Sequence, residues 1–158
     1  MAHEYAVTVQ LAQPRSIAAV RVRLAIRDVP RRFGDFLNQV YAASRAGAIE
    51  LDGQNIFVYN GDAHGEANVE FGVGTRRSFD QIGAVVHSAT PSGEVATTTH
   101  WGDYADLAAA HDAVLAWCRS QGRSIAGPRW EVYGHWSDNP ATRRTDIFYL
   151  LKDDAARR

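Results

Sequence analysis

Apolar and polar residues alternate with a period of two along residues 4–11 and 129–136, the pattern typical of half-buried strands, and six further short stretches also read as strands. The predicted strands cover residues 4–11, 17–24, 55–59, 67–73, 83–88, 94–100, 129–136 and 145–151. Two longer stretches carry apolar residues at helical spacing and predict helices over 29–46 and 103–121. The pattern therefore indicates an α+β protein with two main helices.

The order of predicted elements repeats, with strand-strand-helix-strand-strand occurring twice. We interpret residues 1–158 as a single domain built from pseudo-repeats of about 4–74 and 82–152. A shift of 77 residues aligns Val9 with Val86, Pro14 with Pro91 and Phe71 with Phe148; after the second helix a shift of 74 aligns Tyr59 with Tyr133. The same shift places Glu131 over Phe57, which is read as a core residue.

The stretch 129–136 carries the most informative residue, because its alternation puts Glu131 on one face with Tyr133 and His135. An unpaired ion costs several kcal/mol if such a face is dry. Three partners would compensate: a nearby Arg such as Arg129 or Arg144, a proton on the acid, or a cationic ligand. The alternative is an exposed carboxylate on an edge strand.

The composition argues against nucleic-acid-binding, disulfide-bonded and membrane proteins. The chain has 158 residues, with 17 Lys and Arg against 18 Asp and Glu, so it carries no basic field for a nucleic-acid backbone. A single cysteine, Cys118, excludes an intrachain disulfide and suits a reducing compartment. Neither a membrane-length apolar run nor a signal peptide is recognisable. We expect a cytoplasmic protein with no membrane partner, which does not bind nucleic acid through this chain alone.

Familiar catalytic and cofactor motifs are absent from the sequence. The six histidines make no close pair and there is no second cysteine, so no metal site is predicted. The glycines lack a phosphate-loop pattern, no Gly-x-Ser-x-Gly occurs, and no haem ligand is identifiable. We expect no cofactor. His111 lies on an apolar helix stripe and reads as a satisfied core residue, whereas His100 is either a structural residue at a strand end or a general acid.

Three segments together resemble the GyrI-like small-molecule-binding domain. They are residues 95–104 (Val-Ala-Thr-Thr-Thr-His-Trp-Gly-Asp-Tyr), 130–133 (Trp-Glu-Val-Tyr) and 144–148 (Arg-Thr-Asp-Ile-Phe). The same domain is the effector-binding part of multidrug-sensing MerR- and AraC-type regulators. The resemblance implies a duplicated fold, a curved antiparallel sheet covered by helices, and a ligand cleft between the halves.

The resemblance also assigns roles to single residues. The family's central acid falls on Glu131, its companion tyrosine on Tyr133, and its His-x-Gly-x-Tyr segment on His100, Gly102 and Tyr104. The last strand departs from the family pattern, since Phe148 stands where a tyrosine is common. No helix-turn-helix precedes the domain, so we do not expect a DNA-binding regulator.

We predict a stand-alone protein that binds hydrophobic, often cationic, small molecules in an aromatic pocket. The candidate ligand-binding residues are Glu131, Tyr133, Trp101, Tyr59, Phe57, Phe148 and Tyr149. The alternative is a hydrolase that detoxifies reactive, cyclopropane-bearing natural products, with Glu131, Tyr133 and His100 as catalytic residues. A third alternative is a protein-binding inhibitor, which predicts an exposed patch in place of a pocket.

Overall fold

The computed structural model describes residues 4–153, which divide into two compact units. One unit, called here unit 1, joins the N-terminal segment up to Gln13 to the chain from Pro91 onward. The other, unit 2, is continuous from Pro14 to Thr90. Within the described residues no helix is both long enough and apolar enough to cross a membrane.

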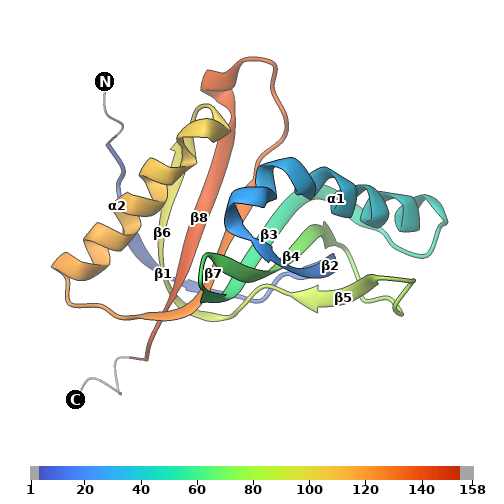
Figure 1. The fold of residues 1–158 in the computed structure, drawn as a ribbon, viewed down its shortest axis with the longest axis horizontal. Helices are drawn as coiled ribbons and strands as arrows, with labels where there is room; N and C mark the ends of the chain where they lie inside the picture. Colours follow the sequence, from blue (N-terminus) through green and yellow to red (C-terminus); the bar gives the residue numbers. More distant parts are fainter. Residues whose placement is uncertain (1–3, 154–158) are drawn as a thin grey trace. The chain divides into compact units, whose positions relative to one another are not determined.

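Unit 2 is an antiparallel sheet with one long helix (Figure 1). Its strands lie in the order β3-β4-β2-β5. The elements are β2 (Ser16–Ala25), the short turn η1 (Ile26–Asp28), α1 (Val29–Arg45), β3 (Leu51–Ala63), β4 (Glu66–Thr75) and β5 (Val85–Ala89). Pro30 in the first turn of α1 needs no backbone hydrogen bond there, which fits the predicted start of this helix.

Unit 1 repeats the plan with the strand order β1-β6-β8-β7. Its elements are β1 (Thr8–Ala12), β6 (Gly93–Trp101), η2 (Tyr104–Asp106), α2 (Leu107–Ser120), β7 (Ile125–Tyr133), η3 (Pro140–Thr142) and β8 (Arg144–Leu151). Asp103 caps η2 by accepting a hydrogen bond from the Ala105 N–H, and α2 proper begins one short turn later than the cap predicts.

These elements confirm the predicted α+β class, the antiparallel strands and the two main helices. The edge strands add a detail that the repeat pattern does not contain. Strand β1 pairs with β6, and β5 pairs with β2, so each unit takes its edge strand from the other predicted repeat. A ligand cleft between the halves stays a prediction.

In each unit the helix packs on one face of its own sheet. Under α1, the Phe36 and Phe71 rings stack with centroids 5.0 Å apart, and Phe57 meets Phe71 edge-on at 5.1 Å. Under α2, the core contains Ala96, Val114, Cys118, Ile147 and Tyr149. Aromatic and aliphatic burial on the helix side of each sheet is the main source of stability in both units.

The register of β8 shows that one predicted pair of repeat positions is wrong by one residue. Phe71 pairs with Phe57 on the α1 side of unit 2. In unit 1 the residue opposite Glu131 is Ile147, which lies in the α2 core, whereas Phe148 is opposite Trp130 and stacks on its ring. A slip of one residue moves a side chain to the other face of a strand, so Ile147 and not Phe148 corresponds to Phe71.

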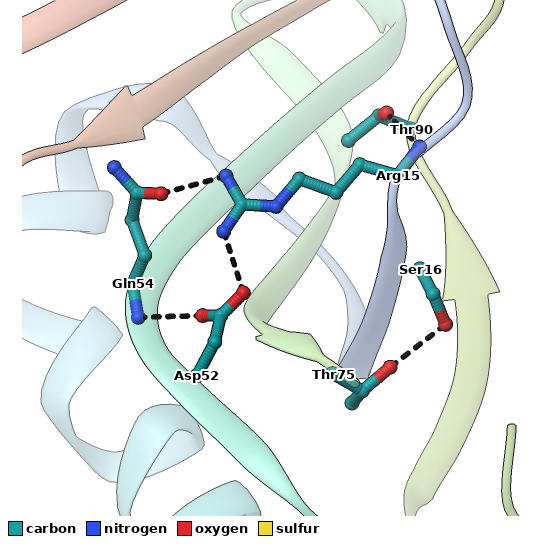
Figure 2. A network of polar contacts seen from close by, with 6 residues as sticks. All are labelled: Arg15, Ser16, Asp52, Gln54, Thr75 and Thr90. Atoms are coloured by element: carbon teal, nitrogen blue, oxygen red, sulfur yellow. Dashed lines mark hydrogen bonds and ion pairs between the residues drawn. The ribbon is translucent and has the colours of Figure 1, made fainter. Parts of the chain in front are cut away.

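An irregularity in β3 of unit 2 is held by a polar network (Figure 2). The Arg15 guanidinium donates to Asp52 Oδ2 at 2.6 Å and to Gln54 Oε1 at 2.7 Å, and the Gln54 N–H donates to Asp52 Oδ1 at 2.9 Å. Burial alone raises the pKa of Asp52, but the bonds from Arg15 and Gln54 and the charge of Arg15 outweigh it, and this pKa lies below its usual value. The network also depends on Gly74, because a Cβ there would lie 2.3 Å from Asp52 Oδ2.

Candidate functional site

Glu131 is the centre of a buried polar chain in unit 1. Its Oε1 accepts a hydrogen bond of 2.7 Å from the Tyr133 hydroxyl. Its Oε2 lies 2.7 Å from Nε2 of His111, and Nδ1 of that imidazole lies 2.7 Å from the Tyr149 hydroxyl. The chain Tyr149–His111–Glu131–Tyr133 therefore joins helix α2 to strands β7 and β8.

Both members of the central pair are largely withdrawn from water. The exposed fraction is 8% for the Glu131 side chain and 19% for that of His111. A carboxylate at this depth loses most of its hydration and needs polar partners to stay ionised. The Tyr133 hydroxyl and the His111 imidazole supply them, and a charge-assisted hydrogen bond of this kind contributes about 1.5–3 kcal/mol.

Local structure explains how these side chains meet. Alternation along β7 puts Glu131 and Tyr133 on one face, as the sequence predicts, and in the structure this is the face that α2 covers. His111 lies on the apolar stripe of α2 with Val114 and Cys118, and that stripe packs on the same face of the sheet. Tyr149 shares this face, since its hydroxyl contacts His111.

The partner of Glu131 is the part of the site that sequence reasoning missed. The sequence predicts His111 to be a satisfied core residue; the structure places it on the sheet-facing side of α2 as expected, with its ring bonded to the Glu131 carboxylate. Of the two arginines considered, Arg144 instead contacts Asp146, with Nε 3.0 Å from Oδ1. One feature of the sequence could have predicted this pair. His111 interrupts the apolar stripe of a helix, and that stripe must pack on a sheet face that carries a lone carboxylate.

An aromatic cluster continues from Tyr133. The Tyr104 and Tyr133 rings meet edge-to-face at 5.5 Å, and Trp136 follows with its centroid 6.2 Å from Tyr104. The Arg143 guanidinium lies 3.8 Å from the centroid of Trp136 and 5.7 Å from that of Tyr104. These rings already hold one cation of the chain by cation–π contact, which shows that their faces are suited to positive charge.

The predicted strand 129–136 ends early, at Tyr133. His135 and Trp136 lie beyond it in an exposed loop, so the expectation that His135 shares the face of Glu131 is wrong. The loop is held by short hydrogen bonds among Ser137, Asn139 and Thr142, and its last residue, Arg143, donates from Nε to the Ser137 carbonyl at 2.8 Å.

His100 is fully buried and has a structural environment. Its Nε2 lies 2.9 Å from the Asp103 carbonyl, which can only accept, so this nitrogen carries the hydrogen. The Tyr5 hydroxyl, 2.7 Å from Nδ1, then donates to the ring. Burial and the nearby Asp106 raise the pKa of Tyr5, which keeps that hydroxyl protonated. The geometry favours the structural alternative for His100 over a general acid.

Thr145 lies between His100 and Tyr133 in the strand register, and it is fully buried. Its Oγ1 makes no hydrogen bond within the described part of the chain. Because buried hydroxyls normally have a hydrogen-bond partner, the Thr145 hydroxyl is a free polar group, on the strand next to Tyr133, that a bound water or ligand could use.

Two further candidates lie on the opposite face of the unit 1 sheet from Glu131. Trp101 is 53% exposed and pairs with Arg144 at the end of β6. Phe148 stacks on Trp130 at 5.3 Å and lines a groove of about 390 Å³. The remaining lining of this groove is mostly polar and comes from Glu4, Ala6, Thr8, Gln10, Thr97, Thr98, Thr99, Arg144 and Asp146. The structure does not bring Trp101 or Phe148 together with Glu131.

The last two candidates belong to unit 2. Phe57 and Tyr59 alternate onto one face of β3, and both are buried, with exposed fractions of 4% and 7%. Phe57 packs among the rings of Phe33 and Phe71 beneath α1. Its place in unit 2 is comparable to that of Glu131 in unit 1, because each residue lies on the helix side of its strand.

No group of three or more His, Cys, Asp or Glu side chains is arranged to hold a metal ion among residues 4–153. The Glu131 cluster can do two things with the groups it has. A carboxylate beside aromatic faces can bind a cation. A carboxylate paired with an imidazole can also accept a proton from water.

Comparison with known proteins gives a family match over nearly the whole chain. The model of the GyrI-like small molecule binding domain matches residues 7–152. No curated protein matches significantly in sequence.

Solved structures with the same fold share little sequence with this chain. EcmrR in its complex with DNA has a TM-score of 0.79 at 16% identity, covering 94% of this chain and 58% of that one. This chain thus spans just over half of that relative. The C-terminal domain of EcmrR alone has a TM-score of 0.73 at 17% identity, with 94% and 98% covered.

Two further structures bear on ligands. SAV2435 bound to tetraphenylphosphonium has a TM-score of 0.65 at 12% identity, covering 98% of this chain and 97% of that one. A hydrolase from Listeria innocua has a TM-score of 0.59 at 11% identity, with 92% and 91% covered. At these identities the likeness establishes the fold alone.

Proposed function

Because the chain belongs to the GyrI-like small-molecule-binding domain family, we propose that it binds hydrophobic cations, with Glu131 as the countercharge and aromatic rings as the contact surface. The observation that carries this proposal is a carboxylate only 8% exposed that is bonded to the Tyr133 hydroxyl and to the His111 imidazole, next to a cluster of aromatic rings. A buried acid arranged in this way favours a cation wherever one can reach it.

The aromatic cluster supports the same function. Tyr133 contacts the acid through its hydroxyl and Tyr104 through its ring. Trp136 is 64% exposed and carries the Arg143 guanidinium on its face. Each cation–π contact contributes about 0.5–2 kcal/mol, so two or three rings around a lipophilic cation give useful affinity without demanding one ligand shape. The tetraphenylphosphonium bound by SAV2435 is a ligand of this class.

The proposal is tested by titrating the protein with tetraphenylphosphonium and following both calorimetric heat and tryptophan fluorescence. Triphenylphosphine oxide, which is neutral and presents similar phenyl rings, is the matched control ligand. We expect saturable one-to-one binding of the cation and weaker binding of the neutral compound. Equal affinity for the two, or no saturable binding of either, would contradict a cation site.

A hydrolase is the second candidate, favoured by the Glu131–His111 pair and by the unsatisfied Thr145 hydroxyl. In this alternative Glu131, assisted by His111, accepts a proton from water, while the Tyr133 phenol polarises the substrate. Thr145 lies beside Tyr133 on the neighbouring strand and would supply a further hydrogen bond to the water. The substrate class is a strained, cyclopropane-bearing electrophile.

Mass spectrometry separates the two candidates. A binder returns a cyclopropane-bearing probe unchanged after incubation. A hydrolase returns the ring-opened product with the mass of one water added, and the oxygen is labelled when the reaction is run in ¹⁸O-water. His135→Gln serves as the control variant, since His135 is exposed in the loop that follows β7.

A further inference from the structure

The two nitrogens of His111 face different kinds of group. Nε2 faces the Glu131 carboxylate at 2.7 Å, and a carboxylate only accepts, so this position carries a hydrogen. Nδ1 faces the Tyr149 hydroxyl at 2.7 Å, and a hydroxyl both donates and accepts. The ring is therefore satisfied when it is neutral, with Tyr149 donating, and when it is protonated, with Tyr149 accepting. Neither state needs a movement of heavy atoms.

The charge at this position thus has two values. With a neutral imidazole the Glu131–His111 pair carries a charge of minus one; with one more proton the pair is neutral. Because the pair is buried, the loss or gain of this single proton decides whether an incoming cation meets a countercharge.

Other titratable and charged groups lie on the described elements packed around the pair. Burial raises the pKa of the Cys118 thiol on α2, which keeps it neutral. Arg129 lies on the same face of β7 as Glu131 and is paired with Tyr149 of β8 in the strand register; its guanidinium stays positively charged over the pH range of the test. On β6, His100 is bonded to Tyr5 and to the Asp103 carbonyl, and Glu94 contacts Arg123. Asp112, next to His111 on α2, is exposed.

We propose that the extra proton on the His111–Glu131 pair competes with a cationic ligand for the same negative charge. Wherever the pair holds that proton, a lipophilic cation binds with its release; where the proton is already lost, the cation binds without releasing one. This inference rests on the proposed cation-binding function. Charge and protons balance in this step. A neutral pair that holds the extra proton and a monocation are the reactants; a complex between the pair, now with a charge of minus one, and the cation is the product, together with one proton released to solvent. A neutral ligand of the same shape releases no proton.

The test is the pH dependence of tetraphenylphosphonium binding between pH 5.5 and 8.5. We expect the Kd to rise about tenfold for each unit that the pH falls below the apparent midpoint of the pair, and to be constant above it. Calorimetry in two buffers of different ionisation enthalpy measures the coupled proton directly. It should show about one proton released per cation at the acid end and none at the alkaline end.

Matched variants identify the group responsible. In His111→Gln, the amide can still donate to Glu131 but cannot take up a proton, so its Kd should vary less than about twofold from pH 6 to 8. His135→Gln removes an exposed histidine four residues from Glu131 and should keep the full wild-type slope. Tyr149→Phe should shift the midpoint and keep the slope.

The outcomes are distinct. A wild-type Kd that is independent of pH, with no proton released, overturns the inference while leaving cation binding intact. A slope that survives in His111→Gln also overturns it, because another group then carries the proton. If His111→Gln does not fold, the proton count of the wild-type protein decides alone. Absence of tetraphenylphosphonium binding at every pH refutes the proposed function itself.

Discussion

Tyr133→Phe removes one hydroxyl from the site and leaves its shape unchanged. In the wild type that hydroxyl donates to Glu131 Oε1 at 2.7 Å, and the receiving side chain is 8% exposed. A hydrogen bond to a buried charged group contributes about 1.5–3 kcal/mol. For a domain of this size about 1 kcal/mol corresponds to about 2–4 °C, so the expected fall in Tm is about 3–12 °C.

Tyr104→Phe is the matched control for this change. Tyr104 packs edge-to-face on Tyr133, yet no hydrogen bond from its hydroxyl exists within the described residues. Its loss should move Tm by no more than about 1–2 °C. Differential scanning calorimetry at pH 7 on the three proteins measures the difference, and urea unfolding gives the free energy independently.

Equal stability of Tyr133→Phe and Tyr104→Phe would contradict this prediction. That result would mean that the Glu131 carboxylate is not ionised in the folded protein or is satisfied equally well without the phenol. The same variants also test binding. If Tyr133→Phe binds tetraphenylphosphonium more weakly than the wild type and Tyr104→Phe binds it equally well, the hydrogen bond from Tyr133 to Glu131 contributes to binding.

Two further predictions concern unit 2. Gly74→Ala should lower the free energy of unfolding, measured by urea titration, by about 1.5–3 kcal/mol, because the new Cβ would lie 2.3 Å from Asp52 Oδ2 and displace that carboxylate from Arg15. Gly34→Ala is the control: a Cβ at this position in α1 meets nothing within 4 Å. It should raise the free energy of unfolding by up to about 1 kcal/mol, because alanine favours the helix over glycine. The second prediction concerns Asp52, whose pKa is depressed in the folded protein, so that in acid the unfolded chain binds more protons than the folded one. The ionised Asp52 carboxylate therefore stabilises the folded protein fully above the unfolded pKa of about 3.9, and this stabilisation is lost as the pH falls through the folded pKa. Unfolding free energies from pH 5 to pH 2 should therefore fall more steeply for the wild type than for Asp52→Asn, and parallel curves would contradict this.

Much of the fold was accessible from periodicity alone. The helix of unit 2 spans Val29–Arg45 against a predicted 29–46, and the strand Ser16–Ala25 contains the predicted 17–24. The helix and residues 21–25 of the strand bury one face, and burial imposes the period that the sequence displays; residues 17–20 are buried on both faces. The exchange of the edge strands β1 and β5 was not accessible, because alternation within a strand says nothing about which neighbour completes its hydrogen bonds.

The candidate site was predictable in part. Alternation correctly placed Glu131 and Tyr133 on one face, and their hydroxyl–carboxylate bond confirms it. Phe148 is a candidate only through the family resemblance, and the register pairs it with Trp130, so its side chain lies on the opposite face of the sheet from Glu131. His111 comes from a helix 20 residues earlier, and only tertiary packing brings an apolar stripe against one particular carboxylate.

The most direct test of the central claim is the charge selectivity of Glu131→Gln. Affinity for tetraphenylphosphonium and for neutral triphenylphosphine oxide is measured by calorimetry on the wild type and the variant, at a pH where the wild-type Kd is constant. The account predicts that the cation loses about tenfold to a hundredfold in affinity, the equivalent of about 1.5–3 kcal/mol, while the neutral ligand binds as before or better. Equal losses for both ligands, or no loss for the cation, would show that Glu131 is a structural residue and contradict the account.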